Sequence, residues 1–195
     1  MPSTAWHLLL ASASPRRLEL LKSVGLQCRV QAPNITEELH EGETPHDYVA
    51  RLAQSKAQVV LTENNRSGVV VLAADTTVVA ADAILEKPQN YAEAVRMWSV
   101  LSGKQHHVLT GVCVSNGIET DVRVVSTQVT MAPITDKAMR EYWASGEPQD
   151  KAGGYAIQGL ASAWVTAVAG SFSNVVGLPL FETNAMLTPY QLNWL

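Results

Sequence analysis

The sequence has few of the features that mark a secreted, zinc-stabilised or membrane protein. Its two cysteines, Cys28 and Cys113, are far apart, and two isolated thiols match neither a zinc motif nor a disulfide framework. The apolar stretch 68–85 is interrupted by Asp75 and Asp82, which argues against a membrane span. The first six residues lack a basic segment, so we expect no signal peptide. We therefore expect a reducing cytoplasm, with each thiol acting as a small buried apolar group.

An excess of positive charge is also missing. The formal net charge is −4, so we expect no broad basic surface for nucleic acid. Phosphate binding would have to depend on a few local cations, which favours a small anionic ligand over a polymer. With 195 residues, 47% of them hydrophobic, the chain is globular and suits one domain, or one domain with two lobes around a cleft.

Three common catalytic motifs are absent from the sequence. There is no GxxxxGK[ST] phosphate loop, and the five histidines are scattered without a spacing such as HExxH. The serines of segment 171–173 lack the flanking glycines of a GxSxG elbow. These absences disfavour a Walker-type NTPase, a histidine-ligated metal site and an elbow-type serine hydrolase.

Strand and helix patterns alternate along the whole chain, without an internal repeat or a low-complexity linker. The sequence predicts loops at 34–45 and 170–179 and turns at 64–68 and 153–155. Asn116-Gly117 is a strong hairpin signal. Together these patterns predict an α/β fold with a mixed sheet. The strands are expected at 6–11, 27–30, 69–74 with a continuation at 77–81, 105–115, 119–131 and 164–168, and the helices at 15–24, 44–62, 90–101, 135–145 and from 179 or 180 onward.

The segment from Ser12 to Arg17 joins an expected strand to an expected helix. Ser14 has the character of an N-cap, and Pro15 suits the first helical position. Arg16 and Arg17 lie in the first turn, where the helix dipole disfavours cations. A bound anion would explain this placement, because the N–H groups of a helix start attract phosphate. The alternative is an exposed basic turn with no specific role.

Asp75 stands inside an apolar strand pattern, in the run Ala-Ala-Asp-Thr-Thr. Burying an unpaired carboxylate is costly, so this side chain must face a partner, a metal or a cleft. The functional interpretation is a metal ligand or general base at the end of a central strand. The alternative is a capping residue at a strand end.

Other polar residues gain meaning only if the fold brings them together. Glu37, Lys56 and Lys87 are each typical of surface charges when considered singly. Gln158 follows a glycine-containing segment and offers both an amide donor and an acceptor. Asp150 and Lys151 are expected to pair with each other.

Taken as an ordered set, these segments resemble the Maf family of nucleotide pyrophosphatases. The matching segments cover nearly the whole chain in family order, and the set is far more specific than any one motif. They are LASASPRR (10–17), ITEELHEGETPHDYVARLAQSKA (35–57), AADTTV (73–78), LEKP (85–88), LSGKQHHVLTGV (101–112), GEPQDKAGGYAIQG (146–159) and GSFSNVVGLP (170–179).

The resemblance implies a single domain spanning 1–195, similar in fold to the inosine-triphosphate pyrophosphatases. That fold has an elongated mixed sheet, flanking helices and two lobes around a deep cleft. The implied reaction releases pyrophosphate from nucleoside triphosphates with a divalent cation, Mg²⁺ or Mn²⁺. The resemblance assigns Asp75 as general base and metal ligand, Glu37 to the metal, and Ser12, Arg17, Lys56 and Lys87 to the triphosphate, while Arg16, Thr76 and Gln158 match positions that distinguish a dTTP/UTP subgroup.

The chain departs from the family at Thr36-Glu37, where Asp-Glu is frequent, so one carboxylate of that pair is missing. The expected substrates are dTTP and UTP, followed by CTP and modified pyrimidine nucleotides, in a housecleaning role. One alternative is a nucleotide-binding regulator of septum formation that needs no turnover. Another is an enzyme of the same fold that acts on a purine or modified nucleotide. The family also suggests a homodimer, with a small nucleotide rather than nucleic acid or membrane as the binding partner.

Overall fold

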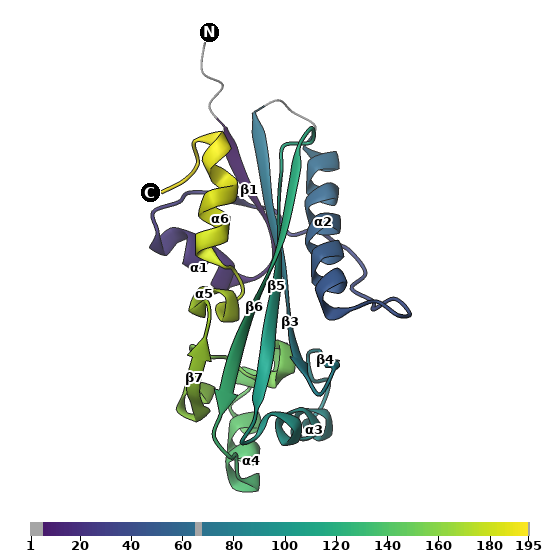
Figure 1. Cartoon of the computed structure of the whole chain (residues 1–195), viewed down its shortest axis with the longest axis vertical. Helices are drawn as coiled ribbons and strands as arrows, with labels where there is room; N and C mark the ends of the chain where they lie inside the picture. Colours follow the sequence, from purple (N-terminus) through teal and green to yellow (C-terminus); the bar gives the residue numbers. More distant parts are fainter. Residues whose placement is uncertain (1–5, 65–67, 195) are drawn as a thin grey trace. The chain divides into compact units, whose positions relative to one another are not determined.

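The computed structural model describes residues 6–64 and 68–194, and these form an α/β fold (Figure 1). The strands are β1 (His7–Ala11), β2 (Arg29–Val30), β3 (Val69–Ala80), β4 (Ala83–Leu85), β5 (Gln105–Ser115), β6 (Thr120–Met131) and β7 (Val165–Ala169). The α-helices are α1 (Pro15–Ser23), α2 (Pro45–Glu63), α3 (Tyr91–Leu101), α4 (Asp136–Ala144), α5 (Phe172–Val176) and α6 (Leu180–Leu187). Short 3₁₀ turns are η1 (Glu147–Asp150), η2 (Ala152–Gly154), η3 (Leu160–Trp164) and η4 (Thr188–Tyr190).

The described strands form one mixed sheet in the order β2-β1-β3-β5-β6-β7, with β4 paired to β3. β1 runs parallel to β2 and β3, whereas β4 is antiparallel to β3 and β7 is antiparallel to β6. The turn at 116–119 joins the neighbouring strands β5 and β6, and so short a connection permits only antiparallel pairing. The expected mixed sheet with flanking helices is therefore confirmed.

The chain divides into two compact units. The first contains residues up to Asp75, 110–125 and 177–195, and the second contains 76–109 and 126–176.

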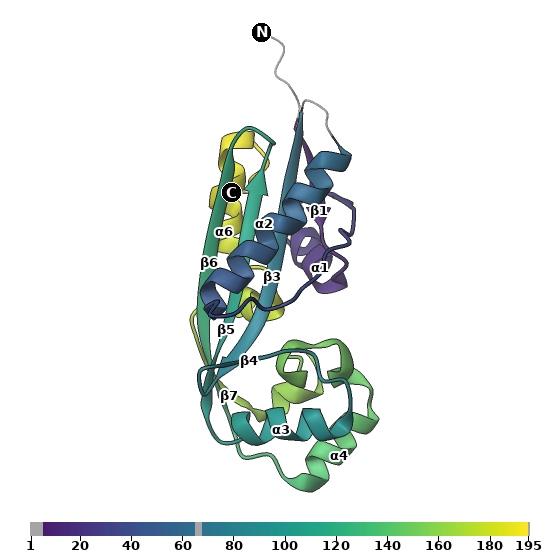
Figure 2. The ribbon, with the colours of Figure 1, turned by 90° about the vertical axis from the view of Figure 1, so that its right-hand side faces the viewer.

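In the first unit, helices cover both faces of the sheet. Leu8 and Leu10 of β1 pack with residues of α1 and α6, whereas Leu9 and Ala11 pack with α2. Figure 2 shows α2 on one face and α6 on the other. A strand that is covered on both faces needs apolar side chains on both, so its sequence is a continuous apolar run. This explains the unbroken hydrophobic pattern of β1 and of the first part of β3.

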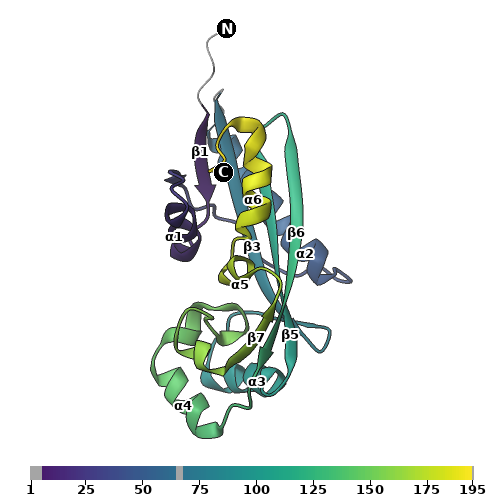
Figure 3. The same ribbon diagram turned by 60° about the vertical axis from the view of Figure 1, so that its left-hand side comes forward.

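The second unit contains α3 and α4 (Figure 3), and these helices carry the buried aromatic residues Trp98 and Tyr142. The Trp98 indole Nε1 donates to the Gly154 carbonyl oxygen at 2.8 Å. The Tyr142 ring lies between Trp98 and Trp164, with centroid separations of 5.4 and 5.0 Å. These contacts anchor the segment after α4 to the helices.

Two expectations about secondary structure were wrong. β3 runs without a break through Asp75, because that carboxylate has a cationic partner and the backbone remains extended. Segment 170–179 contains α5, whose first turn is capped where Asn174 N donates to Ser171 Oγ at 3.2 Å. The turn expected at 153–155 is confirmed, since its two glycines lie in the 3₁₀ turn η2, where both are buried. β4 was not predicted.

The other expected elements are confirmed to within a few residues. Asp150 and Lys151 do form an ion pair. Cys113 is buried and Cys28 is half-buried. The expected turn at 64–68 includes residues 65–67, which lie outside the described residues. Among the described helices, none has the length and apolar character needed to cross a bilayer.

Candidate active site

The first part of the site is the turn between β1 and α1. Ala11 at the end of β1 pairs with Ala73 of β3, so the turn begins beside the segment that leads to Asp75. Ser12 is buried, and its Oγ accepts hydrogen bonds from Ser14 N at 3.1 Å and from Arg17 Nη1 at 3.0 Å. Ser14 occupies the N-cap position, as expected, but its side chain makes no capping bond. Ser12 therefore orders the turn.

Arg17 is the buried cation of this turn. Its side chain is fixed from two directions, because Nε also donates to the Gly177 carbonyl oxygen at 2.8 Å. Burial lowers the pKa of the guanidinium, while the Asp75 carboxylate acts in the opposite direction; Arg16 lowers it further and Glu37 raises it. A buried guanidinium held in one orientation near carboxylates is pre-organised for an oxyanion.

Lys56 joins the two carboxylates that the sequence singled out. Its Nζ lies 2.6 Å from Asp75 Oδ1 and 2.5 Å from Glu37 Oε1. The Lys56 and Asp75 side chains are only 10% and 9% exposed, whereas Glu37 is 41% exposed. Asp75 is thus a buried carboxylate inside a strand, and Lys56 is the charged partner that its burial requires.

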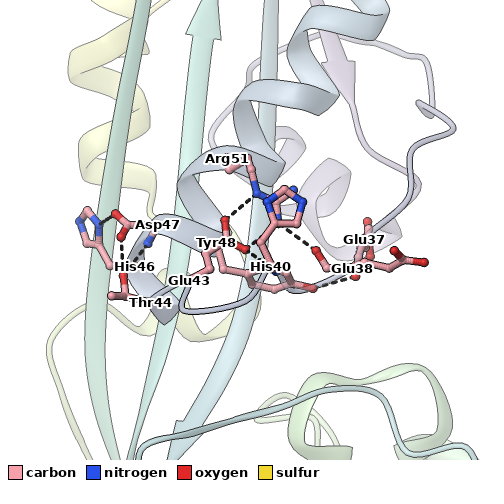
Figure 4. Close-up of polar contacts among 9 residues, drawn as sticks. All are labelled: Glu37, Glu38, His40, Glu43, Thr44, His46, Asp47, Tyr48 and Arg51. Atoms are coloured by element: carbon pink, nitrogen blue, oxygen red, sulfur yellow. Dashed lines mark hydrogen bonds and ion pairs between the residues drawn. The ribbon is translucent and has the colours of Figure 1, made fainter.

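The loop that carries Glu37 leads directly into α2. Thr44 Oγ1 accepts from Asp47 N at 3.1 Å and caps this helix, with Pro45 in its first turn. Figure 4 shows that the loop folds back on the helix beside Tyr48 and Arg51. Sequence reasoning missed the roles of these two residues, because their partners lie in a loop without periodic pattern.

Glu37 and Asp75 are the residues of this site that could hold a metal. No three histidine, cysteine, aspartate or glutamate side chains in the described part of the chain are grouped to hold an ion. Two carboxylates do suit Mg²⁺, which usually binds one or two carboxylates and takes its remaining ligands from substrate phosphates and water. The donor set therefore fits a divalent ion that binds together with a nucleotide.

Three further expected site residues belong to the second unit. Thr76 is half-buried on β3, and Lys87 is exposed in the loop after β4. Gln158 is exposed between two anchored backbone positions. Ala156 N donates to Tyr142 Oη at 3.1 Å, and Leu160 N donates to Glu147 Oε2 at 3.0 Å.

The structure thus groups the expected residues by unit. Arg16, which is half-buried, lies in the first turn of α1 beside Arg17. Of the nine expected residues, six including Arg16 lie in the first unit and three lie in the second. Apart from Arg16, those of the first unit are linked by the hydrogen bond of Arg17 to Ser12, by the ion pairs of Lys56 with Glu37 and Asp75, and by the charge interaction of Arg17 with both carboxylates. The linked residues of the first unit are Ser12, Arg17, Glu37, Lys56 and Asp75, and those of the second unit are Thr76, Lys87 and Gln158.

Two relatives illustrate the similarity of this chain to known proteins. A protein of Pseudoalteromonas atlantica named dTTP/UTP pyrophosphatase is 45% identical over 191 residues, covering 95% of this chain and 97% of the relative. One of the same name from Sphingopyxis alaskensis is 50% identical over 186 residues, covering 93% and 95%.

One solved structure also has a partial likeness to this chain. The Ham1 protein of Staphylococcus aureus aligns with a TM-score of 0.47 and 14% identity, covering 65% of this chain and 72% of that one. The family model described as Maf-like protein matches residues 7–190. Since that match spans nearly the whole chain, and the two relatives match over a similar length, the chain belongs to the Maf family.

Proposed function

We propose that this protein is a nucleoside triphosphate pyrophosphatase that converts dTTP and UTP to the monophosphate and pyrophosphate. The observation that carries the proposal is the buried Lys56 ammonium between Asp75 and Glu37, with the Arg17 guanidinium in the field of both carboxylates. Cations and carboxylates at one place suit a reaction in which positioning and electrostatics do most of the work. The names of the two relatives support the same activity.

In the proposed reaction, a water oxygen attacks the α-phosphorus of the nucleotide. The bond from that phosphorus to the bridging oxygen breaks, and pyrophosphate leaves with the electron pair. Asp75 orients this water and accepts its proton. Arg17, Lys56 and Lys87 offset the negative charge of the triphosphate, and Ser12 donates through its hydroxyl. A divalent cation held by Glu37 and Asp75, Mg²⁺ or Mn²⁺, would supply charge neutralisation at the phosphate oxygens.

Base preference is assigned to Gln158, Arg16 and Thr76. Uracil and thymine present carbonyl acceptors and one N–H donor, and an amide side chain can match both. Arg16 only donates, so it suits a carbonyl and opposes a cationic base such as 7-methylguanine. The exposed position of Gln158 leaves its amide accessible to a ligand.

We further infer a cytoplasmic enzyme whose binding partner is a small nucleotide rather than nucleic acid or membrane. The net charge of −4 supports a small anion as ligand over a polyanion. A housecleaning role toward modified pyrimidine nucleotides, including action on CTP, and a homodimeric state are further predictions. Size-exclusion chromatography with light scattering would test the dimer.

The proposal is tested by measuring pyrophosphate release from a panel of dTTP, UTP, CTP, dATP and dGTP. Each reaction would be run with Mg²⁺, with Mn²⁺ and with a chelator. We expect dTTP and UTP to be cleaved fastest, and only with a divalent ion present. Tight nucleotide binding without release would instead favour the division regulator, and preference for a purine would favour the third interpretation.

A further inference from the structure

The carboxylate of Glu43 is held by an arginine from α2. Arg51 Nε lies 2.5 Å from Glu43 Oε1, and Arg51 Nη2 lies 2.7 Å from Oε2 (Figure 4). The Glu43 side chain is 9% exposed and that of Arg51 is 28% exposed. This two-point contact needs a planar guanidinium, and the single ammonium of lysine cannot reproduce it.

The same helix surface also holds the backbone on which Glu37 is carried. Arg51 Nη2 donates to the Glu38 carbonyl oxygen at 2.9 Å, and Tyr48 Oη donates to the Glu37 carbonyl oxygen at 3.1 Å. The Arg51 guanidinium carbon lies 5.7 Å from the centroid of the Tyr48 ring, so the two side chains support each other. Residues three apart share a helix face, which lets both reach one loop.

Glu43 connects this contact to the turn within the loop. Its Oε2 also accepts from His40 N at 3.1 Å, and Glu43 N donates to the His40 carbonyl oxygen at 3.1 Å. The hydrogen bond from Arg51 lowers the pKa of Glu43 to about 2, so the carboxylate is charged at neutral pH. Segment 31–40 forms neither helix nor strand, so side-chain contacts must fix its course.

We propose that Arg51 is a positioning residue, which keeps the Glu37 carboxylate at Lys56 and Asp75 by holding Glu43 and the Glu38 carbonyl on α2. The inference rests on the proposed function in so far as Glu37 serves metal binding and turnover. Arg51 forms no hydrogen bond or ion pair with Lys56 or Asp75 among the contacts described above. The pKa of its guanidinium is raised chiefly by the hydrogen bond to Glu43, and Asp75 adds only a weaker charge interaction, which a lysine at this position would keep. The effect of Arg51→Lys should therefore pass through the loop, and outer partners of metal ligands typically alter metal affinity or activity by about 10–100-fold.

The first test compares Arg51→Lys with Arg123→Lys. Arg123 is a matched control, because it also donates from two nitrogens to one carboxylate, that of Asp121, in the same unit. Mn²⁺ binding is measured by calorimetry in the presence of a non-hydrolysable dTTP analogue, and loop order by hydrogen exchange at the amides of 38–43 in the nucleotide-free protein. We expect Arg51→Lys to weaken Mn²⁺ binding by about 10–100-fold and to speed exchange in the loop. Arg123→Lys should match the wild type in both.

The second test asks whether Arg51 acts through Glu37. In a Glu37→Gln background, adding Arg51→Lys should cause no further loss of Mn²⁺ affinity or of turnover. In the single variant, raising the Mg²⁺ concentration should restore kcat, which a loss caused by misfolding would not allow. Losses that multiply in the double variant would overturn the proposal.

The test of the positioning role of Arg51 does not depend on whether the wild type releases pyrophosphate. If the wild type releases none, the proposed function fails, but exchange at 38–43 still decides the role of Arg51. Unchanged exchange in Arg51→Lys would overturn the positioning role whatever the activity. Should that variant fail to fold, Glu43→Gln removes the charge from the other partner, and the same loosening of the loop is expected.

Discussion

The Lys56 ammonium lies 2.6 Å from Asp75 Oδ1, and the two side chains are almost equally closed to water. One comes from the middle of α2 and the other from the middle of β3, nineteen residues apart in sequence. The pair thus joins a helix to a central strand inside the first unit. Two charges in such a place must compensate each other, so the removal of one partner is expected to leave a costly buried charge.

Replacing Lys56 by methionine should destabilise the protein by about 3 kcal/mol, because it leaves Asp75 as an uncompensated buried charge. Urea denaturation followed by circular dichroism gives the free energy of unfolding. Lys137→Met is the control, since Lys137 is exposed and pairs with Glu141 at 3.6 Å. That change should stay within about 0.5 kcal/mol. Equal losses in the two variants would contradict the importance of the buried pair.

Replacing Asp75 by asparagine should abolish turnover while the fold survives. Asparagine keeps the shape but cannot take a proton from water, and loss of a general base typically costs about 10²–10⁴ in rate. Lys56 keeps its contact with Glu37 at 2.5 Å, which limits the damage to stability. Pyrophosphate release and circular dichroism are measured on the same preparation. Full activity in a folded Asp75→Asn variant would eliminate the assigned base.

Gln158→Glu should weaken hydrolysis of dTTP, and of UTP with it, by up to about tenfold relative to dGTP, since a carboxylate loses the donor that the amide offers. The experiment compares kcat/KM for dTTP, UTP and dGTP. Gln149→Glu makes the same change of charge at an exposed position of η1 and should leave the ratios as they are. A Gln158→Glu profile that falls equally for all three nucleotides would count against base recognition by this side chain.

Much of the first unit could be predicted because its signals are local. The apolar run of β1, Pro15 after a serine, and Thr44 before Pro45 each identify an element boundary without reference to distant residues. The family motifs added the grouping of Asp75 with Glu37 and Lys56, which spacing alone would not give. The structure brings these three residues within ion-pair distance.

Other features depend on distant contacts and were missed for that reason. A carboxylate inside β3 suggested an interrupted strand, because the partner from α2 cannot be seen in the local pattern. α5 is a single capped turn of five residues, too short for a helical period to show. From the sequence alone, Arg51 is a typical surface charge on a helix, because its contact with Glu43 in the preceding loop is visible only in the structure.

Acidification should destabilise the protein through His106, which is 2% exposed and lies with Nε2 2.7 Å from Tyr155 Oη. Burial, with a smaller effect of His107, lowers the pKa of His106 to about 4 from an ordinary 6.5. The folded state then binds fewer protons than the unfolded state between these values. The contribution of His106 to the free energy of unfolding is therefore fully present above pH 6.5. This contribution falls by roughly 3 kcal/mol as the pH drops to 4.

The measurement for His106 is the free energy of unfolding between pH 4 and pH 7. His106→Leu should remove most of the slope assigned to this residue, at the cost of its bond to Tyr155. His107→Gln, at an exposed neighbouring position, should retain the slope. A wild-type slope that survives unchanged in His106→Leu would assign it to other groups.

Gly111→Ala should be among the most damaging small changes in the first unit. A Cβ at this position of β5 would meet the Val49 carbonyl oxygen and Ala50 N, which are backbone atoms of α2 and cannot move alone. Overpacking of this kind costs about 1–3 kcal/mol or more, and the displaced helix would carry Lys56 away from Asp75, so turnover should fall as well. Gly25→Ala is the contrast, because no atom lies within 4 Å of its added Cβ and only its φ of +79° is unfavourable, at about 1 kcal/mol. The free energy of unfolding in urea and the rate of pyrophosphate release are measured for both variants. A Gly111→Ala protein as stable and active as Gly25→Ala would show that the close packing of α2 on β5 does not require a glycine here.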